Sequence, residues 1–373
     1  MEQTRISWEA PISHDLSYYR NKRVLVTGHN GFKGSWLTFW LNKLGAQVYG
    51  YSLTPAPAEL DESLCHIINL KQDLAGEKLA DIRWYETLEN YFHEVQPEIV
   101  FHLAAQPIVS EGYKYPRQTF ETNVMGTVNV LECIRKTPSV RSAVIITTDK
   151  VYDYNYCPAD GYREGDPLGG FDPYSNSKSC ADLATQCYYN SFFDKGKREI
   201  NFTIFRAGNV IGGGDFAKNR IVPDFYRALR KGENLQLRNP GSIRPYQHVL
   251  EPLYAYLRAG VPTQSGANVY NVGPREYDCA TTESLVNALA GDEVCFDYSP
   301  SDMVESEVLM LNTERIRREG WEPRWNLAAT AAKVSEWYLA YLKDPSDIEG
   351  LRLLMHKQID EYYARVVLGW NAE

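Results

Sequence analysis

Long apolar runs are missing from this 373-residue sequence. No stretch approaches the ~18 uninterrupted apolar residues that a membrane-spanning helix needs. The first fifteen residues, MEQTRISWEAPISHD, lack the apolar segment of a secretory signal peptide. We therefore expect a cytoplasmic protein with no membrane association.

Paired cysteines and basic clusters are also scarce. The seven cysteines are scattered and form no C-x-x-C pair, which indicates reduced thiols. No grouping of histidine and cysteine has metal-ligand spacing, so no metal site is expected. The net charge is −9 and no basic run stands out, which argues against a nucleic-acid partner. A local group of arginines can still bind an anionic ligand.

The first half of the chain alternates apolar runs with segments of helical periodicity. Strands are predicted at residues 22–28, 46–53, 98–105, 142–148 and 201–212, with helices at 35–45, 80–95, 120–137 and 174–193. Such alternation is typical of parallel βαβ units in a Rossmann-like, doubly wound α/β sheet, which binds ligands at the carboxyl ends of its strands. Residues 1–210 are expected to form this domain. Residues 211–373 are expected to form mainly a smaller lobe and C-terminal helices, with later segments returning to the first domain.

A glycine-rich loop lies between the first predicted strand and the first predicted helix. Gly28, Gly31 and Gly34 follow a G-x-x-G-x-x-G spacing, which lets the backbone approach a pyrophosphate at a helix N-terminus. The second strand ends in Tyr51, Ser52 and Leu53, without the carboxylate that would bind a ribose hydroxyl. No lysine or arginine occurs between residues 43 and 71 either. From these residues alone the choice between NAD and NADP stays open, and Lys33 and His29 are candidates to face the phosphates.

A tyrosine and a lysine are spaced one helical turn apart in the segment PYSNSK. Tyr174 and Lys178 share one face of the predicted helix, so the ammonium is expected to lower the pKa of the phenol. Such a phenol can take the proton from an alcohol while its carbon gives up hydride. Thr148 comes from the end of the preceding strand, where a nicotinamide pocket is expected.

Together these features resemble the extended short-chain dehydrogenase/reductase superfamily. Within it, the segments VTGHNGFKGSW, FHLAAQP, TNVMGT, TTDKVY, GYREGDPLGGFDPYSNSK, RAGNVIGGGDF and IRPYQHVLEPL resemble CDP-D-glucose 4,6-dehydratases. The resemblance implies a lyase that uses NAD to convert CDP-D-glucose into CDP-4-keto-6-deoxy-D-glucose by internal hydride transfer. It also implies a place in deoxysugar synthesis, such as that of lipopolysaccharide O-antigens. The alternatives are a dehydratase for another nucleotide sugar and a 4-epimerase.

The resemblance assigns roles to the stretch TTDK. Thr148 would bind the sugar O4 while Tyr174, next to Lys178, takes its proton. Lys150 would then act as the base at C5, and Asp149 as the acid that protonates the departing C6 hydroxyl. A dehydratase needs this second acid/base pair, whereas a simple dehydrogenase does not.

The resemblance also implies which other residues bind cofactor and substrate. The predicted NAD contacts, besides Tyr174 and Lys178, are Gly28, His29, Gly31, Phe32, Lys33, Gly34, Asp81, Ile82, Leu103, Ala104 and Ala105. The predicted substrate contacts, besides Thr148, are Gln106, Asn209, Arg220, Arg238 and Arg244. For Asp81 the competing interpretation is a helix N-cap, and for each arginine a solvated surface position.

Two segments depart from the family pattern. Ser110, Glu111 and Gly112 replace an arginine-containing segment, and residues 153–160 replace a tryptophan-containing loop. Both segments are expected near the sugar, so the sugar or the nucleotide of the substrate can differ from the family norm. The helices at 118–136 and 174–193 resemble those that pair subunits in this superfamily, which predicts a homo-oligomer, a dimer or a tetramer.

Overall fold

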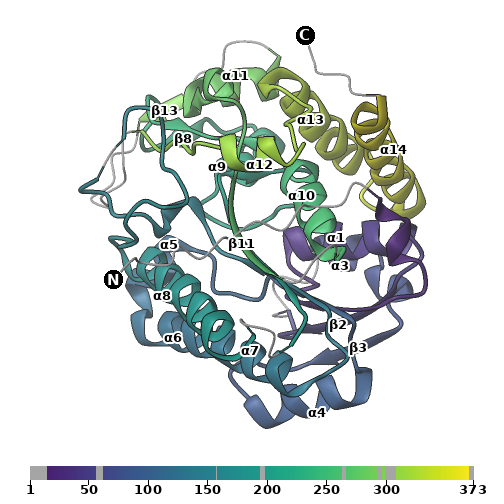
Figure 1. Ribbon diagram of the computed structural model, residues 1–373. Helices are drawn as coiled ribbons and strands as arrows, with labels where there is room; N and C mark the ends of the chain where they lie inside the picture. Colours follow the sequence, from purple (N-terminus) through teal and green to yellow (C-terminus); the bar gives the residue numbers. More distant parts are fainter. Residues whose placement is uncertain are drawn as a thin grey trace.

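The computed structural model (Figure 1) describes residues 15–55, 62–156, 158–193, 198–262, 266–291, 296–298 and 308–368. The N-terminal fifteen residues discussed above lie almost wholly outside this range, as do Cys157 and Cys295. Within the described residues, no helix has the length and apolarity needed to cross a bilayer. The five described cysteines are all free thiols.

A parallel seven-stranded sheet forms the centre of the molecule. Its strand order is β11-β6-β5-β4-β1-β2-β3. The strands are β1 (Arg23–Thr27), β2 (Gln47–Ser52), β3 (Gly76–Leu79), β4 (Ile99–His102), β5 (Ser142–Ile146), β6 (Asn201–Ala207) and β11 (Gly266–Val272). The order reverses at β1, so the crevice between the ends of β1 and β4 is where a doubly wound sheet binds its ligand. The predicted fold class is confirmed.

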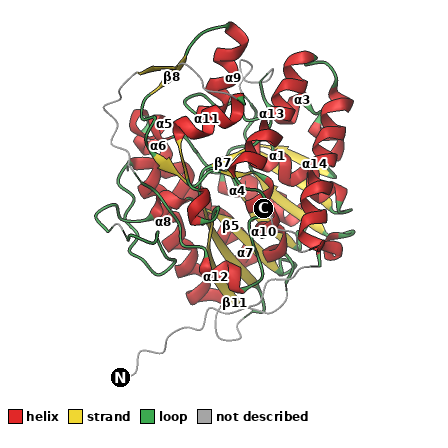
Figure 2. Ribbon diagram, turned by 90° about the horizontal axis from the view of Figure 1, so that it is seen from above, coloured by secondary structure: helices red, strands yellow, loops and turns green. Residues whose placement is uncertain are grey.

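Helices cover both faces of the sheet (Figure 2). On one face lie α1 (Phe32–Lys43) and α10 (Leu250–Gly260), whose side chains join a large apolar core with β1 and β4. On the other lie α4 (Tyr85–Val95), α7 (Gly126–Lys136) and α8 (Pro173–Tyr188). Short elements fill the connections: α3 (Leu64–Ile67), α5 (Val109–Lys114), α6 (Pro116–Phe120), the π-turns Glu121–Met125 and Tyr189–Phe193, and the 3-10 turn Asp149–Val151.

The later half of the chain builds a lobe above the carboxyl ends of the strands. It contains α9 (Ile221–Lys231), α11 (Thr282–Ala290), α12 (Glu314–Arg318), α13 (Leu327–Lys343), and the short strands β7 (Val210–Ile211), β8 (Leu235–Leu237), β9 (Ile243–Arg244), β10 (Gln247–His248), β12 (Ala280–Thr281) and β13 (Phe296–Tyr298). The short strands pair two by two, outside the main sheet.

Segments after residue 211 also pack on the central sheet. Strand β11 pairs with β6 along its whole length, and α10 packs on the sheet. The C-terminal helix α14 (Ile348–Leu368) reaches α1, where Lys43 pairs with Asp360 at 3.0 Å, and Arg352 pairs with Asp73 at 2.8 Å. The same helix also packs on α13 of the lobe, where Lys357 pairs with Glu336 at 2.8 Å.

Candidate functional site

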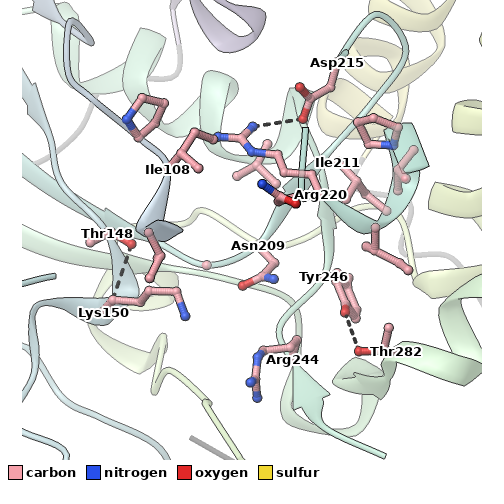
Figure 3. Close-up of a pocket in the computed structure, with 18 of the residues that line it drawn as sticks. Ile108, Thr148, Lys150, Asn209, Ile211, Asp215, Arg220, Arg244, Tyr246 and Thr282 are labelled. Atoms are coloured by element: carbon pink, nitrogen blue, oxygen red, sulfur yellow. Dashed lines mark hydrogen bonds and ion pairs between the residues drawn. The ribbon is translucent and has the colours of Figure 1, made fainter. Parts of the chain in front are cut away.

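A cavity of about 500 Å³ lies between the strand ends and the lobe (Figure 3). One wall comes from residues 147–150 after β5 and from the first turns of α1 and α8. The opposite wall comes from residues 207–224 and from the segment around β8 and β9. The cavity thus lies where the fold places the ligands of a doubly wound sheet.

The end of β5 supplies three of the predicted catalytic side chains. Thr148 Oγ1 donates to Asp149 Oδ1 at 2.9 Å and accepts from the Lys150 backbone N–H at 3.4 Å. Asp149 is only 2% exposed, and its Oδ2 has no hydrogen-bond partner within the described residues. Burial raises the pKa of the Asp149 carboxyl, while Lys150 and the Thr148 hydroxyl oppose that rise. All three residues line the cavity.

Helix α8 brings Tyr174 and Lys178 to the same place. Asp172 caps this helix by accepting from the Tyr174 and Ser175 N–H groups at 2.9 and 3.0 Å, and Pro173 occupies its first turn. Tyr174 lines the cavity beside Thr148. Lys178 is buried, and its ammonium donates to the Ile146 carbonyl at 3.1 Å. The strand end and the helix are therefore tied together by the lysine.

The expected lowering of the Tyr174 pKa by Lys178 is wrong for this structure. Burial raises the pKa of Tyr174 to about 12, although the Thr148 side chain opposes the rise. Burial lowers the pKa of Lys178 to about 7. Desolvation disfavours the charged form of each group, and for Tyr174 it outweighs the opposing effect of the Thr148 side chain. The phenol is therefore protonated at neutral pH in the described protein.

The glycine loop has the shape that a dinucleotide requires. Gly28 has a φ of 75°, and a Cβ at this position would lie 2.7 Å from the Ala104 backbone nitrogen. Gly31 is the N-cap of α1 and makes no side-chain capping bond, so the first amides of the helix are left for a ligand. Leu103, Ala104 and Ala105 follow β4 directly beside this loop. The residues present therefore fit a pyrophosphate-bearing cofactor.

Two side chains of the glycine loop point in different directions. His29 turns inward, packs against Gly50, and its Nε2 lies 2.8 Å from Glu77 Oε1. Lys33 lines the cavity with Thr148 and Asp149. The cofactor roles of His29 and Lys33 stay predictions, as does that of Phe32, which also lines the cavity.

Asp81 is engaged by a neighbour that sequence reasoning overlooked. Arg83 donates to both carboxylate oxygens of Asp81, with the shortest distance 2.6 Å. Burial would raise the pKa of Asp81, but the hydrogen bonds from Arg83 outweigh it and lower the pKa. Helix α4 begins only at Tyr85, so the N-cap interpretation is wrong. A cofactor contact of Asp81 and of the buried Ile82 remains a prediction.

Four of the predicted substrate residues line the opposite side of the cavity. These are Asn209, Arg220, Arg238 and Arg244. Arg220 is held by Asp215 at 2.9 Å, and Figure 3 shows this pair on the wall facing Thr148. Arg244 is buried, which excludes a solvated surface position for it. Sequence reasoning did not single out Asp215, Asn219, Tyr246 and Thr282, which also line the cavity. Asp215 and Tyr246 had a signal, since they lie in the segments RAGNVIGGGDF and IRPYQHVLEPL.

Gln106 lies outside the cavity lining. Its side chain accepts from the Ile108 N–H and donates to Thr119 Oγ1 at 2.9 Å, while its backbone N–H donates to Asn123 Oδ1 at 2.8 Å. These bonds shape the turn that places residues 107–110 in the cavity wall. The predicted substrate contact of Gln106 is thus not brought to the site.

The two departing segments do lie near the site. Ser110 lines the cavity, and its Oγ accepts from the Asn219 side chain at 3.3 Å, which joins the two walls. In the described part of residues 153–160, Tyr154 stacks on Phe171 with ring centroids 6.4 Å apart. The charge of Asp149 helps to raise the pKa of Tyr154, after burial itself. The first segment therefore contributes Ser110 to the cavity wall, and the second places Tyr154 where the charge of Asp149 affects it.

Comparison with known proteins agrees with this geometry. The sequence profile of the NAD dependent epimerase/dehydratase family matches residues 24–273. The chain is 41% identical to the CDP-glucose 4,6-dehydratase of Salmonella typhimurium over 360 residues, which are 93% of this chain and 98% of the relative.

Solved structures show the same fold. The UDP-glucose 4-epimerase of Thermotoga maritima superimposes with a TM-score of 0.75 at 22% identity, covering 86% of this chain and 99% of the other. The dTDP-glucose 4,6-dehydratase of Bacillus anthracis gives 0.72 at 22% identity, covering 86% and 97%. The family match confirms the predicted superfamily and its use of NAD. The chain belongs to the NAD dependent epimerase/dehydratase family, in the branch that resembles CDP-glucose 4,6-dehydratase.

Proposed function

We propose that this protein is an NAD-dependent CDP-D-glucose 4,6-dehydratase. One observation carries the proposal beyond the family: the cavity holds a carboxyl group and an amine, Asp149 and Lys150, beside the alcohol-binding pair Thr148 and Tyr174. Removing water from C5 and C6 of a sugar requires a second acid and a second base, whereas inverting C4 requires neither. The 4-epimerase alternative is therefore disfavoured.

The first half of the reaction is oxidation at C4. Thr148 binds the sugar O4, and Tyr174 accepts its proton as the C4 hydride leaves. When bound, NAD supplies the hydride acceptor and later the hydride donor. Because burial holds the pKa of Tyr174 near 12, the phenol needs additional positive charge in the loaded site to become a base at neutral pH. Lys178 supports the same strand end through its bond to Ile146.

The second half is elimination of water. A 4-ketone acidifies the neighbouring C5 proton, which Lys150 removes. Asp149 protonates the C6 hydroxyl as it departs, and its raised pKa favours the protonated form that this role requires. Lys150 then returns a proton to C5 when hydride enters at C6.

The arginines of the lobe supply the charge that an acidic protein needs to hold a nucleotide diphosphate. Arg220, Arg238 and Arg244 approach the cavity from three separate segments, and guanidinium groups bind phosphate oxygens in pairs. We assign the sugar-nucleotide phosphates to this wall, with Asn209 beside them. The nucleotide assignment to cytidine rests on the similarity to the Salmonella enzyme.

A homo-oligomer in the cytoplasm is the assembly and location we propose. Met125 before α7, Leu183 on α8 and Phe192 just after it are exposed apolar side chains in the two predicted pairing segments. Two such surfaces facing each other would bury these side chains in a four-helix arrangement. The free thiols of the described cysteines suit a reducing compartment. We further place the product in deoxysugar synthesis, including that of O-antigens.

The test of the activity is direct. Purified protein is incubated with CDP-D-glucose and NAD, and the product is followed by proton NMR. We expect a C6 methyl signal and loss of the C4 proton. Appearance of CDP-galactose without a methyl signal would instead establish the 4-epimerase. Parallel incubations with the UDP and dTDP sugars, and with NADP, measure the nucleotide and cofactor preference.

A further inference from the structure

Lys33 has its backbone at the glycine loop and its side chain in the wall of the cavity. It is the second residue of α1, yet it lines the cavity together with Thr148, Asp149, Tyr174 and Arg220. Within the described residues, Lys33 makes no salt bridge and no side-chain hydrogen bond. Its ammonium is therefore a charge placed at the site without a structural partner.

Asp149 offers a complementary group in the same cavity. Its Oδ1 accepts from Thr148, but its Oδ2 is buried without a partner in the described part of the chain. A buried carboxyl oxygen lacking a donor is costly, so it requires a proton or a nearby cation. Because the Lys33 ammonium lines the same cavity, it is a candidate to stabilise this oxygen when Asp149 is ionised.

Several charged or titratable groups face Asp149 from the elements around it. Lys150 comes from the same turn, Arg244 from β9 and Lys33 from α1, and these cations favour its carboxylate. Tyr154 and Tyr174 face it from the loop after that turn and from α8, and the charge of Asp149 raises the pKa of each phenol. Of the three cations, Lys150 and Arg244 already have proposed roles as base and phosphate ligand.

The charge interaction is mutual. Burial, and after it the charge of Arg220, lower the pKa of Lys33 to about 8, although Asp149 and Asp215 oppose this fall. Lys33 also helps to lower the pKa of Lys178, after burial. The charge of Lys33 thus affects Asp149, which we assign to elimination, and Lys178, which supports the site of oxidation.

We propose that Lys33 is a positioning residue for Asp149, whose ammonium stabilises the carboxylate that remains after Asp149 protonates the departing C6 hydroxyl. The inference rests on the dehydratase function proposed above. In that step Lys150 takes the C5 proton, and the C5–H electron pair becomes the second bond between C5 and C6. The C6–O bond breaks with its electrons on oxygen, and the proton from Asp149 completes a water molecule. Lys150 ends as an ammonium, and Asp149 ends as a carboxylate in the cavity that Lys33 also lines.

The competing role for Lys33 is a bond to a cofactor phosphate, and three variants separate the two. Lys33→Met keeps the length of the side chain and removes its charge, whereas Lys33→Arg keeps the charge. Lys43→Met is the matched control, because Lys43 lies on the same helix and pairs with Asp360 at the surface.

We expect Lys33→Met to slow elimination roughly 10- to 100-fold while C4 oxidation continues, since one preorganised cation is lost from a buried site. The limb of the pH–rate profile due to Asp149 should move to higher pH by about one unit. Lys33→Arg should restore most of the rate and the pH profile, and Lys43→Met should match the wild type. The dissociation constant of NAD, measured by calorimetry, should stay within about twofold.

A tenfold weaker NAD affinity in Lys33→Met, with an unchanged pH profile, would overturn the inference and make Lys33 a phosphate ligand. Carbon-13 NMR titration of the Asp149 carboxyl in the full chain without substrate separates this inference from the proposed function. A higher carboxyl pKa in Lys33→Met supports the contact even if CDP-glucose is not dehydrated by the wild type. An unchanged carboxyl pKa overturns it even in an active dehydratase.

Discussion

Helix α8 contributes to two clusters of buried titratable groups, about one turn apart. The two clusters differ in how fully their polar atoms are hydrogen-bonded. In the first, Tyr174 lines the cavity, Lys178 is buried one turn further along, and among the described residues Asp149 Oδ2 has no hydrogen-bond partner. In the second, Asp182 and Arg206 are almost fully buried and are paired through two contacts of 2.8 and 3.0 Å. Arg206 also donates to the Tyr152 hydroxyl and to the Glu164 carbonyl, at 3.0 and 2.9 Å.

This difference in hydrogen bonding indicates a different role for each cluster. A satisfied buried network fixes the relative position of the elements that it joins, here β6, α8 and the segment after β5. An unsatisfied set of titratable groups in a cavity is poised for a ligand, because burial shifts pKa values without a protein partner to correct them. The second cluster therefore supports the first. The changes below separate the two.

The largest expected effect is on catalysis through Tyr174. Tyr174→Phe removes the phenolic hydroxyl and should lower kcat about 10²- to 10⁴-fold, the contribution of a well-placed general base. The free energy of unfolding should change little, because the ring still fills its place. Steady-state kinetics and urea unfolding measure both quantities. A large loss of stability with modest loss of rate would place Tyr174 in the supporting cluster instead.

Arg206 should show the opposite balance. Arg206→Met leaves Asp182 as an unpaired buried charge and should reduce the free energy of unfolding by about 3–5 kcal/mol. The double variant Arg206→Met, Asp182→Leu removes both charges and should recover much of that loss. Chemical denaturation of the three proteins tests this. Equal stability of the single variant and the wild type would contradict the supporting role.

Loss of Arg244 should mainly weaken substrate binding. Arg244→Ala removes a charge-assisted contact and should raise KM for the nucleotide sugar by the equivalent of roughly 1.5–3 kcal/mol. The NAD affinity should stay unchanged. Calorimetric titration with NAD is the control, and an equal loss of NAD binding would assign this arginine to the cofactor or to the fold.

The smallest effect concerns the stability cost of Lys178. Burial lowers its pKa to about 7 in the folded protein, against an ordinary value of 10.5. The unfolded chain therefore binds the extra proton between these values, so the cost is complete below about pH 7 and falls as pH rises toward 10.5. Lys178→Met should stabilise the protein by roughly 1 kcal/mol at neutral or lower pH and by less in alkali. Thermal unfolding across this range measures it, and a destabilising substitution would mean that Lys178 holds the site together instead.

Much of this architecture could be predicted from the sequence. The strands with apolar runs, β1, β2, β4, β5 and β6, follow directly from periodicity. Strand β3 has the sequence GEKL, which is neither apolar nor alternating, and it forms because β2 offers it a parallel partner. Strand β11 lies within residues 211–373 and was not predicted as a strand of the main sheet. Its place beside β6 depends on a contact between distant parts of the chain.

The features of the site also fall into two groups, those that the sequence predicts and those that depend on packing. Tyr174, Lys178 and residues 148–150 could be placed together because strand ends and helix starts meet at one edge of a parallel sheet. The inward turn of His29, the Asp81–Arg83 pair and the internal bonds of Gln106 depend on side-chain packing that spacing does not encode. The error about the Tyr174 pKa has the same origin, because the degree of burial is a property of the folded chain.

The central claim is that residues 148–150 separate oxidation from elimination, and isotope transfer tests it most directly. With deuterium at C4 of CDP-D-glucose, the wild type should deliver deuterium to C6 of the product and solvent hydrogen to C5. The double variant Asp149→Asn, Lys150→Met should still remove the C4 hydride and should hold a 4-keto sugar with reduced cofactor, without forming the methyl group. A wild-type product without that migration, or a double variant that dehydrates at the full rate, would contradict the account.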